Sequence, residues 1–89
     1  MIKIRNAWIK AIQEYKASSK QDYVAWENIL KVLVYLCADK RDIKRYDTIA
    51  ADLGLSIDVV KRSFTALMAI EFTGLDIKKK LAWIKLEEN

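Results

Sequence analysis

Residues 46–67 read YDTIAADLGLSIDVVKRSFTAL, and this stretch decides the fold. Its pattern predicts two short helices joined by a tight turn. Gly54 stands where the first helix must end in a left-handed backbone conformation, which glycine adopts without a steric penalty. Asp47 is predicted to cap the first helix and Ser56 the second. Leu55, between the two helices, is expected to enter the core beneath the turn.

The apolar residues of this stretch recur at helical spacing, so each predicted helix has one apolar side. The first helix presents Ile49, Ala50 and Leu53, and the second presents Val60, Phe64 and Leu67. Ala50 is small, and a bulky side chain there would push the two helices apart where they cross. Asp58 stands in the first turn of the second helix, where a negative charge suits the positive helix end.

The stretch from Ile49 to Ser56, followed by Val60, Lys61 and Arg62, resembles the core of winged helix-turn-helix DNA-binding domains. An alanine four residues before the glycine and a valine six residues after it carry the resemblance. The close match covers about a quarter of the chain, and a looser match extends to the C-terminus. The resemblance implies a single domain over residues 1–89, mainly α, with three or four helices and a small C-terminal β-hairpin.

The residues after the second helix fit such a hairpin, or wing. Segments 71–77 and 81–86 both have strand character, and Lys78, Lys79 and Lys80 lie between them. Two strands joined by a short basic tip are typical of a wing in this position. The tip lacks the usual turn glycine, which leaves the hairpin geometry open.

The first half of the chain is predicted to be helical, because proline is absent and both glycines lie in the second half. A helix with Asn6 as its N-cap presents Trp8, Ala11, Ile12 and Tyr15 on one side. Residues 2–5 alternate, and they fit either a short strand or the first turn. The polar segment 16–21 is predicted to be a connection.

The strongest helix signal runs from about Asp22 to Ala38. Its apolar stripe contains Tyr23, Trp26, Ile29, Leu30, Leu33, Val34 and Cys37, widened by Val32 and Leu36. A helix this apolar is expected to lie centrally, with neighbours on more than one face. The charged residues 39–45 are predicted to form a solvated link. Alternatively, this link clamps a nucleic-acid backbone through Lys40, Arg41, Lys44 and Arg45.

The composition argues against an enzyme. The sequence has no histidine, which excludes imidazole acid–base chemistry, histidine-containing triads and zinc sites built from cysteine and histidine. The single cysteine, Cys37, cannot form an internal disulfide. Neither a glycine-rich phosphate loop nor a paired nucleophile and base is found. We therefore expect no catalytic activity, no cofactor and no bound metal.

The chain is also expected to be cytoplasmic. No run approaches the roughly 20 apolar residues that span a bilayer. The basic start, residues 1–5, is not followed by the apolar segment of a secretory signal.

The formal net charge of +4 favours a polyanionic partner.

The resemblance implies that the second helix lies in the major groove of double-stranded DNA and that the wing touches the adjoining backbone or minor groove. The DNA-binding residues expected on this basis are Ser56, Ile57, Asp58, Lys61, Arg62, Thr65, Lys78, Lys79 and Lys80. Arg62 is expected to bind guanine bidentately, and Lys61 to bind phosphate. Ile57 suits a thymine methyl group, and Ser56 suits a phosphate oxygen. The three lysines of the tip would neutralise backbone charge.

Two function classes remain open. The first is a small DNA-binding regulator, or a replication or partition factor, of phage or plasmid type. The second is a winged helix that docks on a polymerase or another regulator, which Ile57 and Asp58 favour because the same fold serves both uses. A homodimer through the N-terminal helix, by way of Trp8, Ile12 and Tyr15, is expected for a palindromic target. The alternative is that this stripe covers the central helix.

Overall fold

The computed structural model describes residues 4–38 and 45–70. The elements are α1 (Asn6–Glu14), a short 3₁₀ helix η1 (Lys20–Asp22), α2 (Trp26–Ala38), α3 (Tyr46–Leu53) and α4 (Ile57–Ala69). These residues contain no strand, so this part of the chain is all-α. The strands expected at 71–77 and 81–86, the lysine tip and most of the link 39–45 lie outside the described residues.

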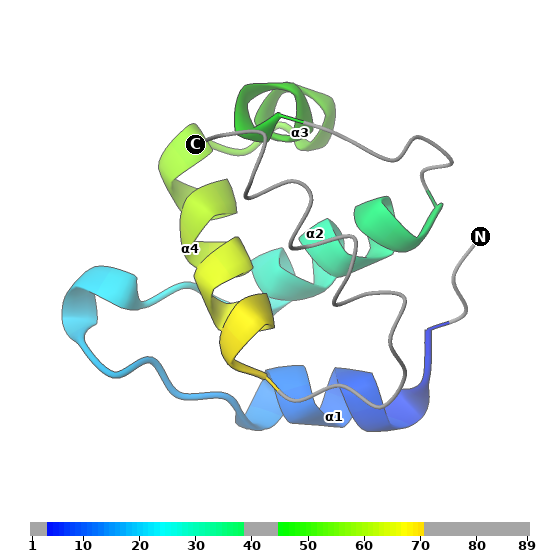
Figure 1. Cartoon of the computed structure of the whole chain (residues 1–89), viewed down its shortest axis with the longest axis vertical. Helices are drawn as coiled ribbons and strands as arrows, with labels where there is room; N and C mark the ends of the chain where they lie inside the picture. Colours follow the sequence, from blue (N-terminus) through cyan, green and yellow to red (C-terminus); the bar gives the residue numbers. More distant parts are fainter. Residues whose placement is uncertain (1–3, 39–44, 71–89) are drawn as a thin grey trace.

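Helix α2 lies at the centre of the arrangement, as its broad apolar stripe predicted. Figure 1 shows α3 above it, α1 below it and α4 beside it. Each of these helices contacts α2, and α3 also contacts α4. Helices α3 and α4, which form the predicted pair of helices, are therefore one wall of a common helical core.

The buried face of α2 differs from the predicted stripe. It consists of Ile29, Val32, Leu33, Leu36 and Cys37. Three predicted members are exposed instead, namely Tyr23 at 64%, Trp26 at 39% and Val34 at 45%. Tyr23 precedes α2, which begins at Trp26 and not at Asp22. Trp26 and Val34 are exposed because α2 is apolar on most sides, so the positions of the neighbouring helices, and not the periodicity of α2, determine its buried face.

The predicted N-cap of α1 is wrong by one residue. Arg5 holds the N-cap position, and Asn6 is already the first helical residue. The carbonyl oxygen of Arg5 accepts hydrogen bonds from the backbone N–H groups of Trp8 and Ile9. The guanidinium carbon of Arg5 lies 5.8 Å from the centroid of the Trp8 ring. A cation–π contact thus accompanies a helix start that lacks a side-chain cap.

The predicted N-cap of α3 is wrong as well, since Arg45 and not Asp47 precedes the helix. Asp47 lies in the first turn, where its Oδ1 accepts from the backbone N–H of Thr48 at 2.8 Å. The start moves back because Tyr46 packs into the helix bundle, with its ring centroid 4.9 Å from that of Phe64 in an edge-on contact. Tertiary packing of an aromatic ring therefore outweighs the local capping preference.

The turn between α3 and α4 confirms the predictions made for it. Gly54 is left-handed, with φ 68° and ψ 31°. Its N–H donates to the carbonyl of Ala51, and the N–H of Leu55 donates to the carbonyl of Ala50 at 2.9 Å. This pair of bonds is the Schellman arrangement that closes a helix. Leu55 is half-buried against the core, and Ser56 caps α4 by accepting the N–H of Val59 at 3.1 Å.

Replacing Gly54 by alanine is expected to destabilise the protein by about 1–2 kcal/mol, because a Cβ penalises the left-handed conformation. A Cβ built at Gly54 meets no atom within 4 Å, so the cost lies in the backbone and not in a clash. Chemical denaturation measures the change. Gly54→Asn is the control and should lose less, since asparagine tolerates this conformation better. Equal stability of the Gly54→Ala protein and wild type would contradict the expectation.

Candidate nucleic-acid interface

Helix α4 has one buried and one exposed side, and the predicted DNA-binding residues lie on the exposed side. Val60, Ser63, Phe64, Ala66 and Leu67 are buried. The outward side chains are Ile57, Asp58, Lys61 and Thr65, which are exposed, and Arg62, which is partly exposed. Ser56 precedes them as the N-cap. The structure thus brings six of the nine predicted site residues together on one surface, named here the α4 face.

Two hydroxyl groups of α4 bond back to its own backbone. Ser63 is fully buried, and its Oγ donates to the carbonyl of Val59 at 2.8 Å. This bond satisfies a polar group that would otherwise be costly inside the core. Thr65 Oγ1 donates to the carbonyl of Lys61 at 3.1 Å. Thr65 therefore offers the α4 face a methyl group and acceptor lone pairs, while its hydroxyl proton is already used.

Arg62 is held by two groups. Its Nη2 lies 2.9 Å from Asp58 Oδ2, one helical turn earlier. Its Nη1 donates to the carbonyl oxygen of Tyr23 at 3.2 Å, across 39 positions of sequence. The guanidinium would have to leave one or both partners before it read a guanine edge bidentately. The sequence did not reveal this second contact, because nothing local marks Tyr23 as a neighbour of α4.

Lys61 is the basic residue of the α4 face that makes no salt bridge with any residue in the two described ranges. Its Nζ lies 6.0 Å from the centroid of the Tyr46 ring. That distance is at the outer limit of a cation–π contact, so the ring restrains the ammonium group only weakly. The charge of Lys61 is therefore available to an anion that approaches the α4 face.

The other basic residues that the sequence analysis related to DNA lie, except for Arg45, outside the described residues. Lys78, Lys79 and Lys80 lie outside the described part, as do Lys40, Arg41 and Lys44. Arg45 is described, and its Nε lies 3.5 Å from Asp47 Oδ1. Both side chains of that pair are largely exposed, which is typical of a weak surface ion pair.

The apolar side of α1 packs inside the chain. Trp8 and Ile12 are buried in the core, and Tyr15 is half-buried against it. This is the packing alternative of the sequence analysis. The homodimer itself stays a prediction, and Trp8 and Ile12 do not offer it an exposed surface.

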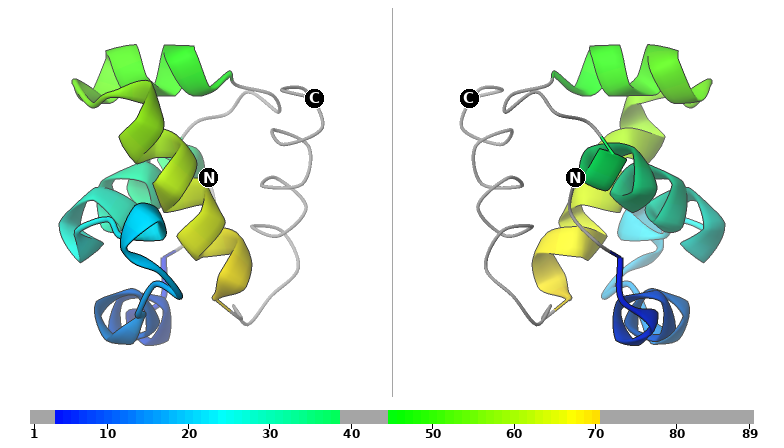
Figure 2. Two further views of the ribbon diagram at one scale, coloured as in Figure 1. Left: turned by 90° about the vertical axis from the view of Figure 1, so that its left-hand side faces the viewer. Right: turned by 90° about the vertical axis from the view of Figure 1, so that its right-hand side faces the viewer.

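The connection between α1 and α2 lies beside the α4 face. It contains η1 and is joined to α4 by the hydrogen bond from Arg62 to Tyr23. In the left view of Figure 2, this connection and α4 face the viewer together. It also lines an open hollow of about 500 Å³. The sequence predicts only a connection here, because the position of the segment depends on a contact with Arg62 that is far away in sequence.

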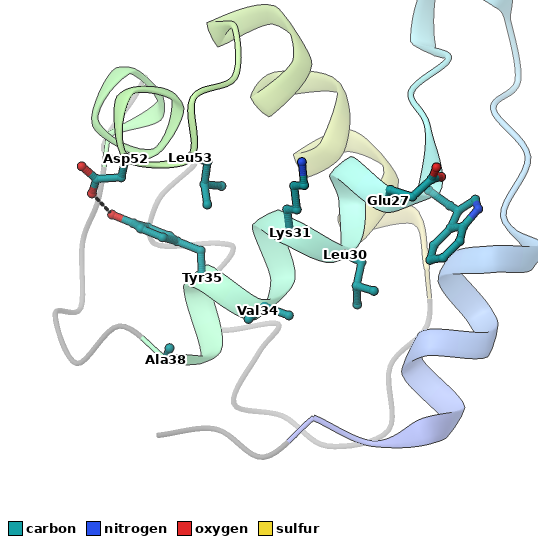
Figure 3. Close-up of a pocket in the computed structure, with 9 residues that line it drawn as sticks. Glu27, Leu30, Lys31, Val34, Tyr35, Ala38, Asp52 and Leu53 are labelled. Carbon is teal, nitrogen blue, oxygen red and sulfur yellow. Dashed lines mark hydrogen bonds between the residues drawn. The ribbon is translucent and has the colours of Figure 1, made fainter.

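A groove of about 740 Å³ runs along α2 and one end of α3 (Figure 3). Its lining residues are Trp26, Glu27, Leu30, Lys31, Val34, Tyr35, Ala38, Asp52 and Leu53. The Tyr35 hydroxyl donates to the Asp52 carboxylate and so links the two helices at the end of the groove. The apolar residues of α2 in this groove are spaced four apart, which places them along one side of the helix.

Comparisons with known protein families, with curated proteins and with solved structures find no match to this chain. Among the residues that the structure describes, no three acidic or cysteine side chains gather as metal ligands would. None of the helices in the same residues combines the length and the apolarity that crossing a membrane requires.

Proposed function

We propose that this protein binds double-stranded DNA through the α4 face, as a small winged helix-turn-helix regulator or as a replication or partition factor. The observation that carries the proposal is the geometry of residues 46–69. A glycine-closed helix meets a second, capped helix whose outward side chains include Lys61, Arg62 and Ile57. Such a second helix is the element that enters the major groove in this class of domain.

Each side chain has a role that its surroundings support. Lys61 approaches a backbone phosphate, since it has no acidic partner among the described residues. Ser56 uses a lone pair for the N–H of Val59, which leaves its hydroxyl proton for a phosphate oxygen at the helix start. Ile57 is 46% exposed and supplies the apolar contact that a thymine methyl group attracts.

Asp58 and Arg62 act together in this proposal. Asp58 alone would repel phosphates, but its carboxylate is paired with Arg62, so the pair presents little net charge. When Arg62 turns to a guanine, Asp58 is left to accept a hydrogen bond from a cytosine amino group or from water. Residues 71–86 would supply the wing, with Lys78, Lys79 and Lys80 on the adjoining backbone.

The test is a salt titration in which fluorescence anisotropy measures the binding of the wild-type protein to a mixed-sequence duplex. We expect about micromolar affinity at moderate salt and a linear fall of log K with log salt concentration. The absence of binding at low salt would overturn the proposal.

The groove along α2 favours a second candidate function, the docking of another protein. Val34 and Trp26 are exposed there, beside the charged residues Glu27 and Lys31. An amphipathic helix of a partner, with its own apolar residues at four-residue spacing, has the chemistry to fill such a groove. Exposed apolar surface of this kind is typical of interaction sites.

Val34→Lys tests the second candidate, because it places a charge in the groove without touching the core. A purified partner that binds wild type and the Lys61→Ala/Arg62→Ala protein, but not the Val34→Lys protein, would establish docking in the groove. Equal binding of that partner to Val34→Lys and wild type would exclude it.

A further inference from the structure

The connection between α1 and α2 carries positive charge on the same side of the molecule as the α4 face. Lys16 and Lys20 are both exposed, and both line the open hollow of this connection. Neither lysine forms a salt bridge with a residue of the described ranges. The acidic residue of the connection, Asp22, accepts a hydrogen bond from Ser19 Oγ at 3.2 Å.

The other groups around the hollow suit a phosphate. Ser18 contributes a hydroxyl group, and Tyr15 and Tyr23 also line the hollow, whereas the hydroxyl proton of Ser19 is already donated to Asp22. Lysine ammonium groups and serine and tyrosine hydroxyls are among the side-chain groups that contact DNA phosphates. A hollow that combines both kinds of donor is therefore suited to one phosphodiester of a nucleic-acid backbone.

The position of this hollow is fixed relative to α4. Arg62 Nη1 donates to the carbonyl of Tyr23, the residue next to η1, so the connection is fastened to the middle of the α4 face. Figure 2 shows the two elements side by side in the left view. A duplex whose major groove receives α4 would present a backbone strand along the edge of that groove.

We propose that Lys16 and Lys20 bind the DNA backbone beside the groove that α4 enters, with the hollow between them receiving a phosphate. This inference rests on the proposed function. It adds a second DNA-contact surface on the connection between α1 and α2, residues 15–25, which is called the α1–α2 loop from here on. In this arrangement Arg62 keeps its hydrogen bond to the Tyr23 carbonyl and acts as a positioning residue for the loop, in place of the bidentate guanine contact.

The test compares two double variants that each remove two positive charges. Lys16→Ala/Lys20→Ala removes the lysines of the loop, and Lys10→Ala/Lys31→Ala removes exposed lysines of α1 and of the α2 groove. In the loop variant, the slope of log K against log salt concentration should become shallower by about 0.9, which is the contribution of the one phosphate that the hollow receives. The charge-matched control should keep the wild-type slope, and Lys16→Arg/Lys20→Arg should restore it.

Three outcomes are distinguishable. A shallower slope in the loop variant alone supports the inference. Equal slopes for the loop variant and its control, while Lys61→Ala still weakens binding, overturn the loop contact and leave the α4 face in place. Failure of the wild-type protein to bind any duplex overturns the proposed function, and the loop contact with it. Circular dichroism of each variant shows that the helices are intact.

Discussion

The Lys61→Ala/Arg62→Ala protein is expected to bind duplex DNA roughly 30- to 700-fold more weakly than wild type. The estimate takes about 2–4 kcal/mol for the loss of one phosphate contact and one bidentate or positioning contact. Both side chains lie on the outward side of α4, where their removal leaves the core unchanged. Fluorescence anisotropy at constant salt measures the loss, and Lys10→Ala/Lys31→Ala is the control for charge alone.

The Arg62→Ala variant distinguishes the two possible roles of Arg62, which are a base contact and the anchoring of the α1–α2 loop. Loss of a base contact in Arg62→Ala would relax the preference for one base pair and leave non-specific affinity almost unchanged. Loss of the loop anchor would instead weaken binding to all sequences alike, because the Tyr23 carbonyl no longer has its donor. Unchanged affinity of the double variant would remove α4 from the interface altogether.

Replacing Leu33 by alanine is expected to destabilise the protein by about 2–5 kcal/mol, since it leaves a cavity in the core beside the middle of α2. Leu33 is fully buried among residues from the surrounding helices. A chain of this size has only about 5–10 kcal/mol of stability in total. The melting temperature should therefore fall by at least about 10 °C, as measured by circular dichroism.

The adjacent residue provides a matched control for that experiment. Val34 is 45% exposed on the same helix, and Val34→Ala should change the unfolding free energy by no more than about 0.5 kcal/mol. Similar effects at Leu33 and Val34 would show that α2 is not packed as described. Because Val34 lines the groove, its alanine variant also shows whether that groove contributes to stability.

The sequence predicted the α3–α4 unit well because its signals are local. A glycine that must be left-handed, a serine cap three residues before its partner N–H and an apolar residue on every turn are all determined within a few residues. The same reasoning placed the outward residues of α4 correctly. The caps predicted at Asn6 and Asp47 were wrong by one and two residues, and an aromatic contact accompanies each observed helix start. A capping preference contributes only about 1 kcal/mol, so such contacts compete with it.

The surfaces around α2 were beyond sequence reasoning for a different reason. The buried face of an amphipathic helix can be predicted from its apolar stripe. Because α2 is apolar nearly all round, residues 26, 30 and 34 fit the buried face as well as residues 29, 33 and 36 do. Only the position of α1, α3 and α4 decides between them. The hydrogen bond from Arg62 to Tyr23 is equally non-local. Since the sequence does not predict this bond, it also does not predict that the α1–α2 loop lies beside α4.

Cys37 gives the molecule an internal reporter of its own opening. It is the single cysteine of the chain and is 2% exposed near the end of α2. A thiol reagent reaches its sulfur only when that part of the core opens, so the labelling rate reports how often this happens in the native protein. Labelling that slows when duplex DNA is added would reveal, without any variant, that the bound ligand and the closed helical core stabilise each other.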